Sequence, residues 1–307
     1  MPDVSVIVVN WNTRALLERC LAAVQAGAGP LSVELIVVDN ASSDDSVAMV
    51  RERFPEARLI ANAENVGFAR ANNQGLAVAA GRYCLLLNSD AFLDAGALER
   101  LVQYMDAHPR AGAAGPRLRY EDGSLQRSCF SFPTLATELW QALWLDRLFP
   151  RSRVFGRYQM TYWDLDDTRE VDSLMGAALL LRREALAQVG GLDERFFMYS
   201  EEVDLCYRLR QAGWQNHFVH TATAIHLWGG SARQVPAQTF LRLYRSRVQF
   251  FQKHYGAATT AALRLLLFGS SLVRVTGATL GLVFNHQPER LHSLSNYRAL
   301  AGQVWRL

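Results

Sequence analysis

Three short runs of β-branched and other apolar residues stand in the first third of the 307-residue chain, at 4–9, 33–38 and 83–87. Runs that are apolar on both faces are typical of strands buried in a parallel sheet. Segments with a helical spacing of apolar residues alternate with these runs, at 13–25, 45–54, 65–81 and 95–107. This alternation predicts an α/β fold with a doubly wound, mostly parallel sheet flanked by helices.

The second half of the chain is less regular. Residues 116–170 are rich in aromatic residues and arginine and predict a long excursion over the surface. Strand-like stretches at 173–182 and 218–226 flank a helix-like segment at 201–213. We therefore expect one α/β domain followed by a C-terminal amphipathic helical tail. The expected bounds are 1–240 for the domain, with halves 1–115 and 116–240, and 241–307 for the tail.

Charge is unevenly distributed along the chain. The net charge is +3, but from Arg242 onward nine Lys and Arg residues stand against one acid, Glu289, so the tail carries +8 and the rest −5. Such a tail suggests an anionic partner, either lipid headgroups or nucleic acid. No nucleic-acid-binding motif accompanies the charge. We therefore expect an anionic membrane surface as partner and no nucleic acid.

The tail contains a mostly apolar stretch, 261–284, interrupted by Arg264 and Arg274. Two arginines at this depth disfavour a span across the bilayer, and an interfacial helix pair with arginines at headgroup level is the expectation. The alternative is packing on the α/β domain or on a second copy in a homo-oligomer.

The cysteines and the N-terminal residues indicate the compartment. The four cysteines are scattered without a Cys-x-x-Cys pair, as expected for core residues in a reducing compartment. No secretory leader is recognisable before the first strand-like run. We expect a cytoplasmic protein, peripheral on the inner face of the membrane.

Several enzyme classes lack their motifs here. The chain has no Gly-x-Gly-x-x-Gly after the first strand, no Walker-type Gly-Lys-Ser/Thr, no His/Cys zinc cluster and no Gly-x-Ser-x-Gly elbow. Polar clusters instead follow three predicted strands, at 10–12, 39–43 and 88–90. Ligands of doubly wound sheets bind beyond the carboxyl ends of the strands, so these clusters are the candidate site.

Two carboxylates in these clusters suggest specific chemistry. Asp39 can accept a hydrogen bond from the N3–H of uracil or thymine, or it can cap the turn at 42–45. Asp90 can coordinate a divalent cation that neutralises a departing diphosphate, or it can cap the following helix.

These segments together resemble glycosyltransferase family 2, in particular its rhamnosyltransferase-like branch of polysaccharide and cell-wall assembly. The matching stretches are Val-Ser-Val-Ile-Val-Val-Asn-Trp-Asn from Val4, Val-Val-Asp-Asn-Ala-Ser-Ser-Asp from Val37, Asn-Val-Gly-Phe-Ala-Arg-Ala-Asn-Asn-Gln-Gly from Asn65, Leu-Leu-Asn-Ser-Asp-Ala from Leu86 and Phe-Phe-Met-Tyr-Ser-Glu-Glu-Val-Asp-Leu-Cys from Phe196. The resemblance runs in the family's order from about residue 3 to 255.

The resemblance implies a GT-A fold and an inverting transfer from a nucleotide-sugar donor. It favours dTDP-L-rhamnose, with a UDP-hexose possible, and a lipid-linked or polysaccharide hydroxyl as acceptor. It also implies a divalent cation, Mg²⁺ or Mn²⁺. Domain halves 1–115 and 116–240 would bind nucleotide and acceptor.

The resemblance further implies roles for individual residues. Asp39 matches the aspartate that reads the pyrimidine base. Asn88-Ser89-Asp90 matches the metal-binding Asp-x-Asp element, with Asp90 as its remaining carboxylate, and His226 is similar to a histidine that supplies a further metal ligand. The candidate nucleotide-sugar-binding residues are Asn10, Asn12, Asp39, Asn65, Gly67, Arg70, Asn72, Asn88 and Ser89.

Glu201 and Glu202 stand where the family has a Glu-Asp pair whose second member is the general base, which favours Glu202. Asp204 is the alternative base, although its i, i+4 spacing to Arg208 also predicts an ion pair on the helix surface.

Two other functions stay open at this point. A sugar-nucleotide nucleotidyltransferase of the same fold would open with a glycine-rich basic loop, which residues 10–14 do not form. A non-catalytic nucleotide-sugar-binding module would not need Asp39, Asp90 and the acidic pair together.

Overall fold

The structure is a computed structural model that describes residues 1–227, 229, 236–284 and 288–307. The chain forms two compact units. The sheet unit comprises Met1–Phe132, Trp163–Phe197 and Glu201–Gln234, and the helical unit comprises Pro133–Tyr162, Met198–Ser200 and Val235–Leu307. Residues 133–162 thus belong to the same unit as the tail. The expected boundary at 240 placed them in the α/β domain instead.

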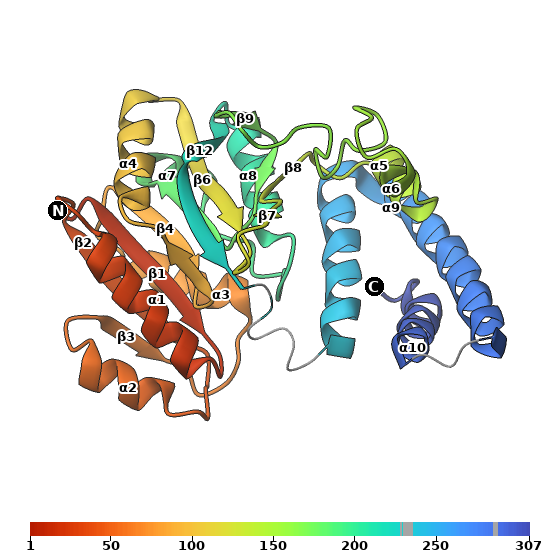
Figure 1. The fold of residues 1–307 in the computed structure, drawn as a ribbon, viewed down its shortest axis with the longest axis horizontal. Coiled ribbons are helices and arrows are strands. Elements are labelled where there is room, and N and C mark those ends of the chain that lie inside the picture. Colours follow the sequence, from red (N-terminus) through yellow and green to blue (C-terminus); the bar gives the residue numbers. More distant parts are fainter. Residues whose placement is uncertain (228, 230–235, 285–287) are drawn as a thin grey trace. The chain divides into compact units, whose positions relative to one another are not determined.

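The sheet unit is built on one mixed sheet (Figure 1). Along its main path the strand order is β3-β2-β1-β4-β11-β6-β12-β5. The strands are β1 (Val4–Asn10), β2 (Val33–Asp39), β3 (Arg58–Ala61), β4 (Tyr83–Asn88), β5 (Ala91–Leu93), β6 (Ala111–Arg119), β11 (Ala178–Arg182) and β12 (Gln215–His226). β11 and β5 run antiparallel to the other six. The doubly wound, mostly parallel arrangement expected from the apolar runs is confirmed.

Four short strands complete the unit. β7 (Leu125–Gln126) pairs with β6, and β9 (Arg169–Val171) pairs with β12. β8 (Cys129–Phe130) and β10 (Ser173–Leu174) form a separate two-stranded sheet.

Helices cover both faces of the sheet. They are α1 (Arg14–Gly27), α2 (Ser46–Arg53), α3 (Phe68–Val78), α4 (Ala97–Ala107), α7 (Arg183–Val189) and α8 (Glu201–Gln211). Val4, Val6 and Val8 of β1 share one buried cluster with residues of α1, α2 and α4. Ile7 points to the other face, where a Cβ added to Gly75 of α3 would collide with it. Burial on both faces explains why β1 has no polar alternation.

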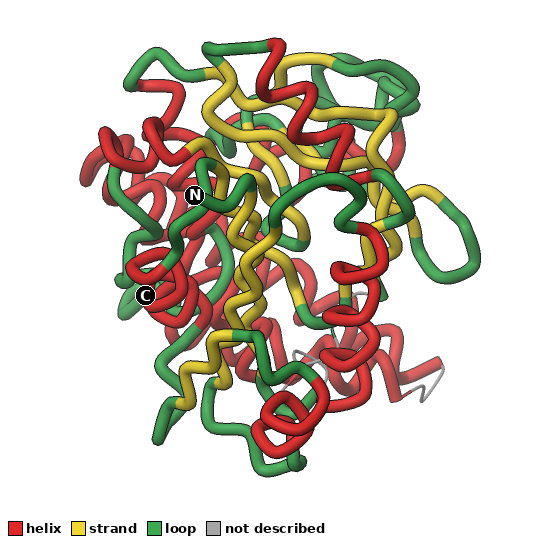
Figure 2. The backbone as a smooth tube through the Cα atoms, turned by 90° about the vertical axis from the view of Figure 1, so that its left-hand side faces the viewer, coloured by secondary structure: helices red, strands yellow, loops and turns green. Residues whose placement is uncertain are grey.

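The helical unit contains helices and loops only among its described residues. Figure 2 shows the helices, strands and loops of the chain from a second direction. Its helices are α5 (Leu135–Ala142), α6 (Leu145–Leu148), α9 (Pro236–Phe284) and α10 (Pro288–Gln303). α9 is interrupted at Gly256, which has φ 80° and ψ 176°. A buried ion pair between Arg247 and Glu138, with the Tyr158 hydroxyl 2.7 Å from Arg247, joins α9 to the 133–162 segment.

The predicted helical tail is therefore present. Residues Gln238–Leu280 of α9 are long and apolar enough to cross a membrane by length and composition, a criterion that helices of soluble proteins also meet.

Candidate active site

A buried chain of hydrogen bonds joins the carboxyl ends of β1, β2 and β4. Asn10, which has no exposed surface, donates through Nδ2 to Asp39 Oδ1 and to Ser42 Oγ, each at 3.0 Å. Thr13 Oγ1 donates to Asn10 Oδ1 at 2.7 Å and lies 2.9 Å from Ser89 Oγ. The structure thus brings together the three polar clusters, because parallel strands end at one edge of the sheet.

Asp39 and Asn12 shape the loop after β2. Asp39 is only 2% exposed, and its Oδ2 accepts from the Ser42 N–H at 2.9 Å, so the alternative role as a turn cap is real. Asn12, with φ 53°, accepts from the Ser43 N–H through Oδ1 at 2.7 Å. A carboxylate has about four acceptor positions. The two bonds to Asp39 therefore leave it the capacity to accept from a base as well.

Asn40 is a site residue that the sequence did not single out. Its Nδ2 donates to Asn65 Oδ1 at 2.9 Å, and its Oδ1 accepts from the Val66 N–H at 3.0 Å and from Asn62 Nδ2 at 3.2 Å. Asn40 is 3% exposed, so it fixes the loop before α3 from inside. Asn65 contributes to the same loop by accepting from the Gly67 N–H at 3.1 Å.

The other three candidates in this region have structural contacts. Gly67 has φ 88°, and a Cβ there would lie 2.7 Å from the Phe197 carbonyl oxygen, so only glycine fits. Asn72 is buried and donates to the Phe68 carbonyl at 2.9 Å within α3. Arg70 is 59% exposed, with its Nε 3.9 Å from Glu194. Gly67 and Asn72 thus shape the start of α3, and Arg70 stands at the surface.

The predicted metal residues lie in contact. His226 ends β12 and pairs with Ala91 of β5, next to Asp90. His226 Nε2 is 3.3 Å from Asp90 Oδ1, and both side chains are less than a tenth exposed. Asn88 Nδ2 is 3.5 Å from the same Nε2, while Asn88 Oδ1 is buried with no hydrogen-bond partner among the described residues.

Gln126 of β7 fixes the orientation of the His226 ring. The sequence did not identify this residue. Its Oε1 lies 2.8 Å from His226 Nδ1, and Gln126 is 1% exposed. A carbonyl oxygen only accepts, so Nδ1 carries the hydrogen and Nε2 is directed at Asp90. A cation between Nε2 and the Asp90 carboxylate would have a ligand on either side.

The donor set suits a divalent cation. A carboxylate, an amide oxygen and an imidazole are together ligands for Mn²⁺ or Mg²⁺, and the unpartnered Asn88 Oδ1 is an available oxygen. Within the described part of the chain, no three His, Cys, Asp or Glu residues gather into a metal cluster.

The acidic pair opens α8. Glu201 is 4% exposed, and burial first, then the charge of Glu202, raises its pKa well above the ordinary value. Glu202 is half-buried, and a Cβ on Gly176 would lie 3.6 Å from Glu202 Cβ. The next residue, Ala177, accepts from the Asn88 N–H at 2.9 Å. Glu202 thus lies close to the strand end that carries Asp90.

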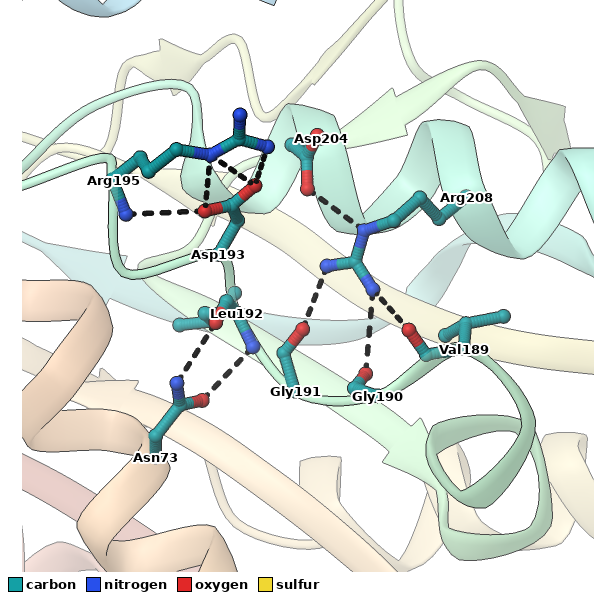
Figure 3. Close-up of polar contacts among 9 residues, drawn as sticks. All are labelled: Asn73, Val189, Gly190, Gly191, Leu192, Asp193, Arg195, Asp204 and Arg208. Atoms are coloured by element: carbon teal, nitrogen blue, oxygen red, sulfur yellow. Dashed lines mark hydrogen bonds and ion pairs between the residues drawn. The ribbon is translucent and has the colours of Figure 1, made fainter. Parts of the chain in front are cut away.

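Asp204 has a different environment (Figure 3). It has no exposed surface, and its Oδ2 is 2.8 Å from Arg208 Nε. Arg208 also donates to backbone carbonyls at the end of α7, including that of Gly191 at 2.6 Å. The predicted ion pair is confirmed, but it is buried and not on the helix surface as expected. The Asp204 carboxylate is paired with Arg208, and Arg208 in turn holds the turn after α7. This engagement favours Glu202 over Asp204 as the candidate base.

Glu201 predicts a pH dependence of stability. The folded chain holds the Glu201 proton to a higher pH than the unfolded chain, so the free energy of unfolding should fall as pH rises above about 4.3, the ordinary value for Glu. Glu201→Gln has no proton to lose and should gain stability relative to the wild type as pH rises from 5 to 8. Urea denaturation across this range measures the difference. Parallel pH profiles for the two proteins would contradict the assignment.

The chain is similar to proteins of known family. The model of the family described as glycosyl transferase family 2 matches residues 5–189. N-acetylglucosaminyl-diphospho-decaprenol L-rhamnosyltransferase of Mycobacterium tuberculosis (strain ATCC 25618 / H37Rv) is 33% identical over 287 residues, which cover 89% of this chain and 92% of that protein. Rhamnosyltransferase WbbL of Escherichia coli (strain K12) is 29% identical over 168 residues, 52% of this chain and 60% of that protein.

Solved structures show the same fold at lower identity. The mannosyltransferase PcManGT from Pyrobaculum calidifontis, in complex with GDP-Man and Mn²⁺, has a TM-score of 0.59 at 19% identity, over 98% of this chain and 87% of that one. GalNAc-T7 with UDP, GalNAc and Mn²⁺ has a TM-score of 0.53 at 14% identity, over 74% and 43%. The fold is the GT-A fold. With the family match over more than half of its length, the chain belongs to glycosyl transferase family 2.

Proposed function

We propose that this glycosyltransferase moves L-rhamnose from dTDP-L-rhamnose, with inversion, to a hydroxyl of a lipid-linked or polysaccharide acceptor. The observation that carries the proposal is the placement of Asp90, His226 and Glu202 about one strand end. The relative that matches 89% of the chain is named for L-rhamnosyl transfer to a diphospho-decaprenol acceptor, which supports this donor and a lipid-linked acceptor. A UDP-hexose is the second candidate donor.

Asp90, His226 and the Asn88 amide oxygen are the residues that would hold Mn²⁺ or Mg²⁺, with the imidazole favouring Mn²⁺. When bound, the cation neutralises the negative charge that builds up on the departing nucleoside diphosphate. Gln126 holds the imidazole so that Nε2 faces the site, as the hydrogen-bonding partners of metal-bound histidines do.

Asp39 would accept a hydrogen bond from the pyrimidine base. Its two bonds, from Asn10 and the Ser42 N–H, hold the carboxylate in one orientation before any nucleotide binds. Asn12 and Asn40 hold the loops on either side of it. A preorganised acceptor loses less conformational freedom on binding.

Glu202 would remove the proton from the acceptor hydroxyl as that oxygen attacks the anomeric carbon. Burial first, and then the charge of Glu202, raises the pKa of Glu201, so Glu201 keeps its proton to a higher pH than an ordinary glutamate. Different environments give two adjacent carboxyl groups different protonation states. A single displacement by the activated oxygen inverts the anomeric configuration.

A membrane location follows from the proposed acceptor. We propose that the protein works on the cytoplasmic face of a membrane as a peripheral protein. Support comes from the basic tail, from the apolar α9 and from the lipid-linked acceptor in the name of the relative.

Removal of a metal ligand tests the cation. Asp90→Ala should abolish the Mn²⁺-dependent part of dTDP binding measured by calorimetry, because Asp90 is the only carboxylate of its element. Gln126→Leu should weaken Mn²⁺ binding about 10–100-fold, the usual effect of losing a residue that orients a ligand, and Gln126→Glu should restore it. Asp122→Ala, at an exposed turn, is the control. Equal dTDP binding by the wild type with Mn²⁺ and with EDTA would remove the cation from the site.

Replacement of Glu202 tests the base. Glu202→Gln keeps the size of the side chain but cannot take a proton, so kcat should fall about 10²–10⁴-fold with the donor KM nearly unchanged. Glu202→Asp should keep partial activity.

Asp204→Asn is the matched comparison. It leaves the buried Arg208 charge without its carboxylate, so it should lower stability by about 3–5 kcal/mol while the folded fraction keeps its turnover. If Asp204→Asn stops turnover of folded protein and Glu202→Gln does not, the base is Asp204.

A further inference from the structure

Exposed large apolar side chains are concentrated in the helical unit. Of the fourteen found among the described residues, eleven belong to this unit and three to the sheet unit. Five of the eleven stand within twelve residues, between α5 and the loop after α6. They are Leu143, Trp144, Leu148, Phe149 and Val154. Apolar side chains scattered singly are ordinary on a surface, but a group of this size marks an interaction site.

Four arginines lie among these apolar residues. Arg147, Arg151, Arg153 and Arg157 are all exposed, and the one acid between 143 and 157 is Asp146. We name residues 143–157 the arginine patch. Its formal charge is therefore +3 within fifteen residues.

Aromatic and cation–π contacts hold the arginine patch in place within the helical unit. The ring of Phe155 meets Trp140 edge-on, with centroids 5.2 Å apart, and lies 5.5 Å from Phe149. The guanidinium of Arg274 in α9 stands 4.2 Å over the Trp144 ring and donates to the Gln141 carbonyl at 3.3 Å. The exposed side chains are thus presented by an ordered segment tied to α9.

Two arginines of α9 bond to backbone carbonyls within the helical unit. Arg264 and Arg274 are half-buried and bond inward, Arg264 to the Leu307 carbonyl at 3.4 Å. They do not stand at headgroup level on the outer side of the helix, as the sequence led us to expect. Every exposed residue from 257 to 280 is uncharged.

We propose that the arginine patch is a membrane anchor that inserts shallowly into an anionic bilayer. Arginine pairs with phosphate through two parallel hydrogen bonds, which places the four guanidinium groups at the lipid phosphates. Leu148, Phe149 and Val154 then enter the acyl boundary, as the apolar side chains of interfacial segments do. The exposed residues of α9 between 257 and 280 are also uncharged, and Leu265, Leu272, Val273 and Leu280 are among them.

The charge favours a bilayer over a second copy of the chain. In a two-fold dimer the same surface meets itself, which would set four arginines against four others. Anionic lipids instead attract clusters of basic residues next to a membrane. The anchor deepens the proposed membrane location, but it is tested by lipid binding and stands whether or not rhamnose is the transferred sugar.

Two variants of the full chain test the anchor. Arg147, Arg151 and Arg153 are changed together to Gln in one, and Leu148, Phe149 and Val154 together to Ser in the other. Binding is measured by co-sedimentation with vesicles of phosphatidylglycerol and phosphatidylcholine, and with phosphatidylcholine alone. The charge variant should bind the anionic vesicles about a hundredfold more weakly, from the usual contribution of three basic residues near such a surface. The apolar variant should lose the binding that remains at high salt.

The controls separate the anchor from the catalytic site and from folding. Arg51, Arg53 and Arg110, exposed arginines of the sheet unit, changed together to Gln should keep vesicle binding. Both test variants should keep their circular dichroism spectrum and their transfer to a soluble acceptor. Undiminished vesicle binding by both variants would overturn the proposal, as would a wild-type dimer, seen by ultracentrifugation, that the two variants fail to form.

Discussion

The buried side chain of Asn10 holds together the strand ends that carry the candidate nucleotide-binding residues. It has no exposed surface, and a buried amide is costly unless its donors and acceptor are all used. Its two donor bonds go to the loop after β2, and its acceptor bond connects through Thr13 to Ser89 after β4. One side chain thus fixes three strand ends relative to each other. These bonds position Asp39, the candidate base-binding residue, and Ser89, which is next to the candidate metal ligand Asp90.

The helix that carries the acidic pair depends on a second polar contact, the ion pair between Arg208 and the buried Asp204. Arg208 pairs with Asp204 and bonds to the turn at 189–191, and Asn73 of α3 makes two bonds to Leu192 just beyond that turn (Figure 3). α3 and α8 are therefore tied to the same turn. α8 begins with the acidic pair, so the contacts of Asp204 in its first turn and of Arg208 in its last turn also position Glu201 and Glu202.

Much of the fold could be predicted from the sequence, because buried parallel strands such as β1 are apolar on both faces and stand out in any window. The meeting of Asn10, Asp39 and Ser89 also follows from strand topology. Contacts between distant positions could not be predicted: Gln126 meets His226 across 100 residues, and Glu138 meets Arg247 across 109. Spacing predicted the Asp204–Arg208 pair but not its burial, since helical periodicity says nothing about what packs on the helix.

The break at Gly256 has a consequence for the shape of the helical unit. No neighbour lies within 4 Å of the place where a Cβ would stand, so packing does not require glycine there. Only the backbone does, because φ 80° with ψ 176° is accessible to essentially no other residue. An unbroken α9 of 49 residues would be a rod of about 74 Å. The break in α9 therefore depends on Gly256 having no side chain. Replacing Gly256 with a residue that has a Cβ would disfavour the break and favour one continuous helix over two shorter ones.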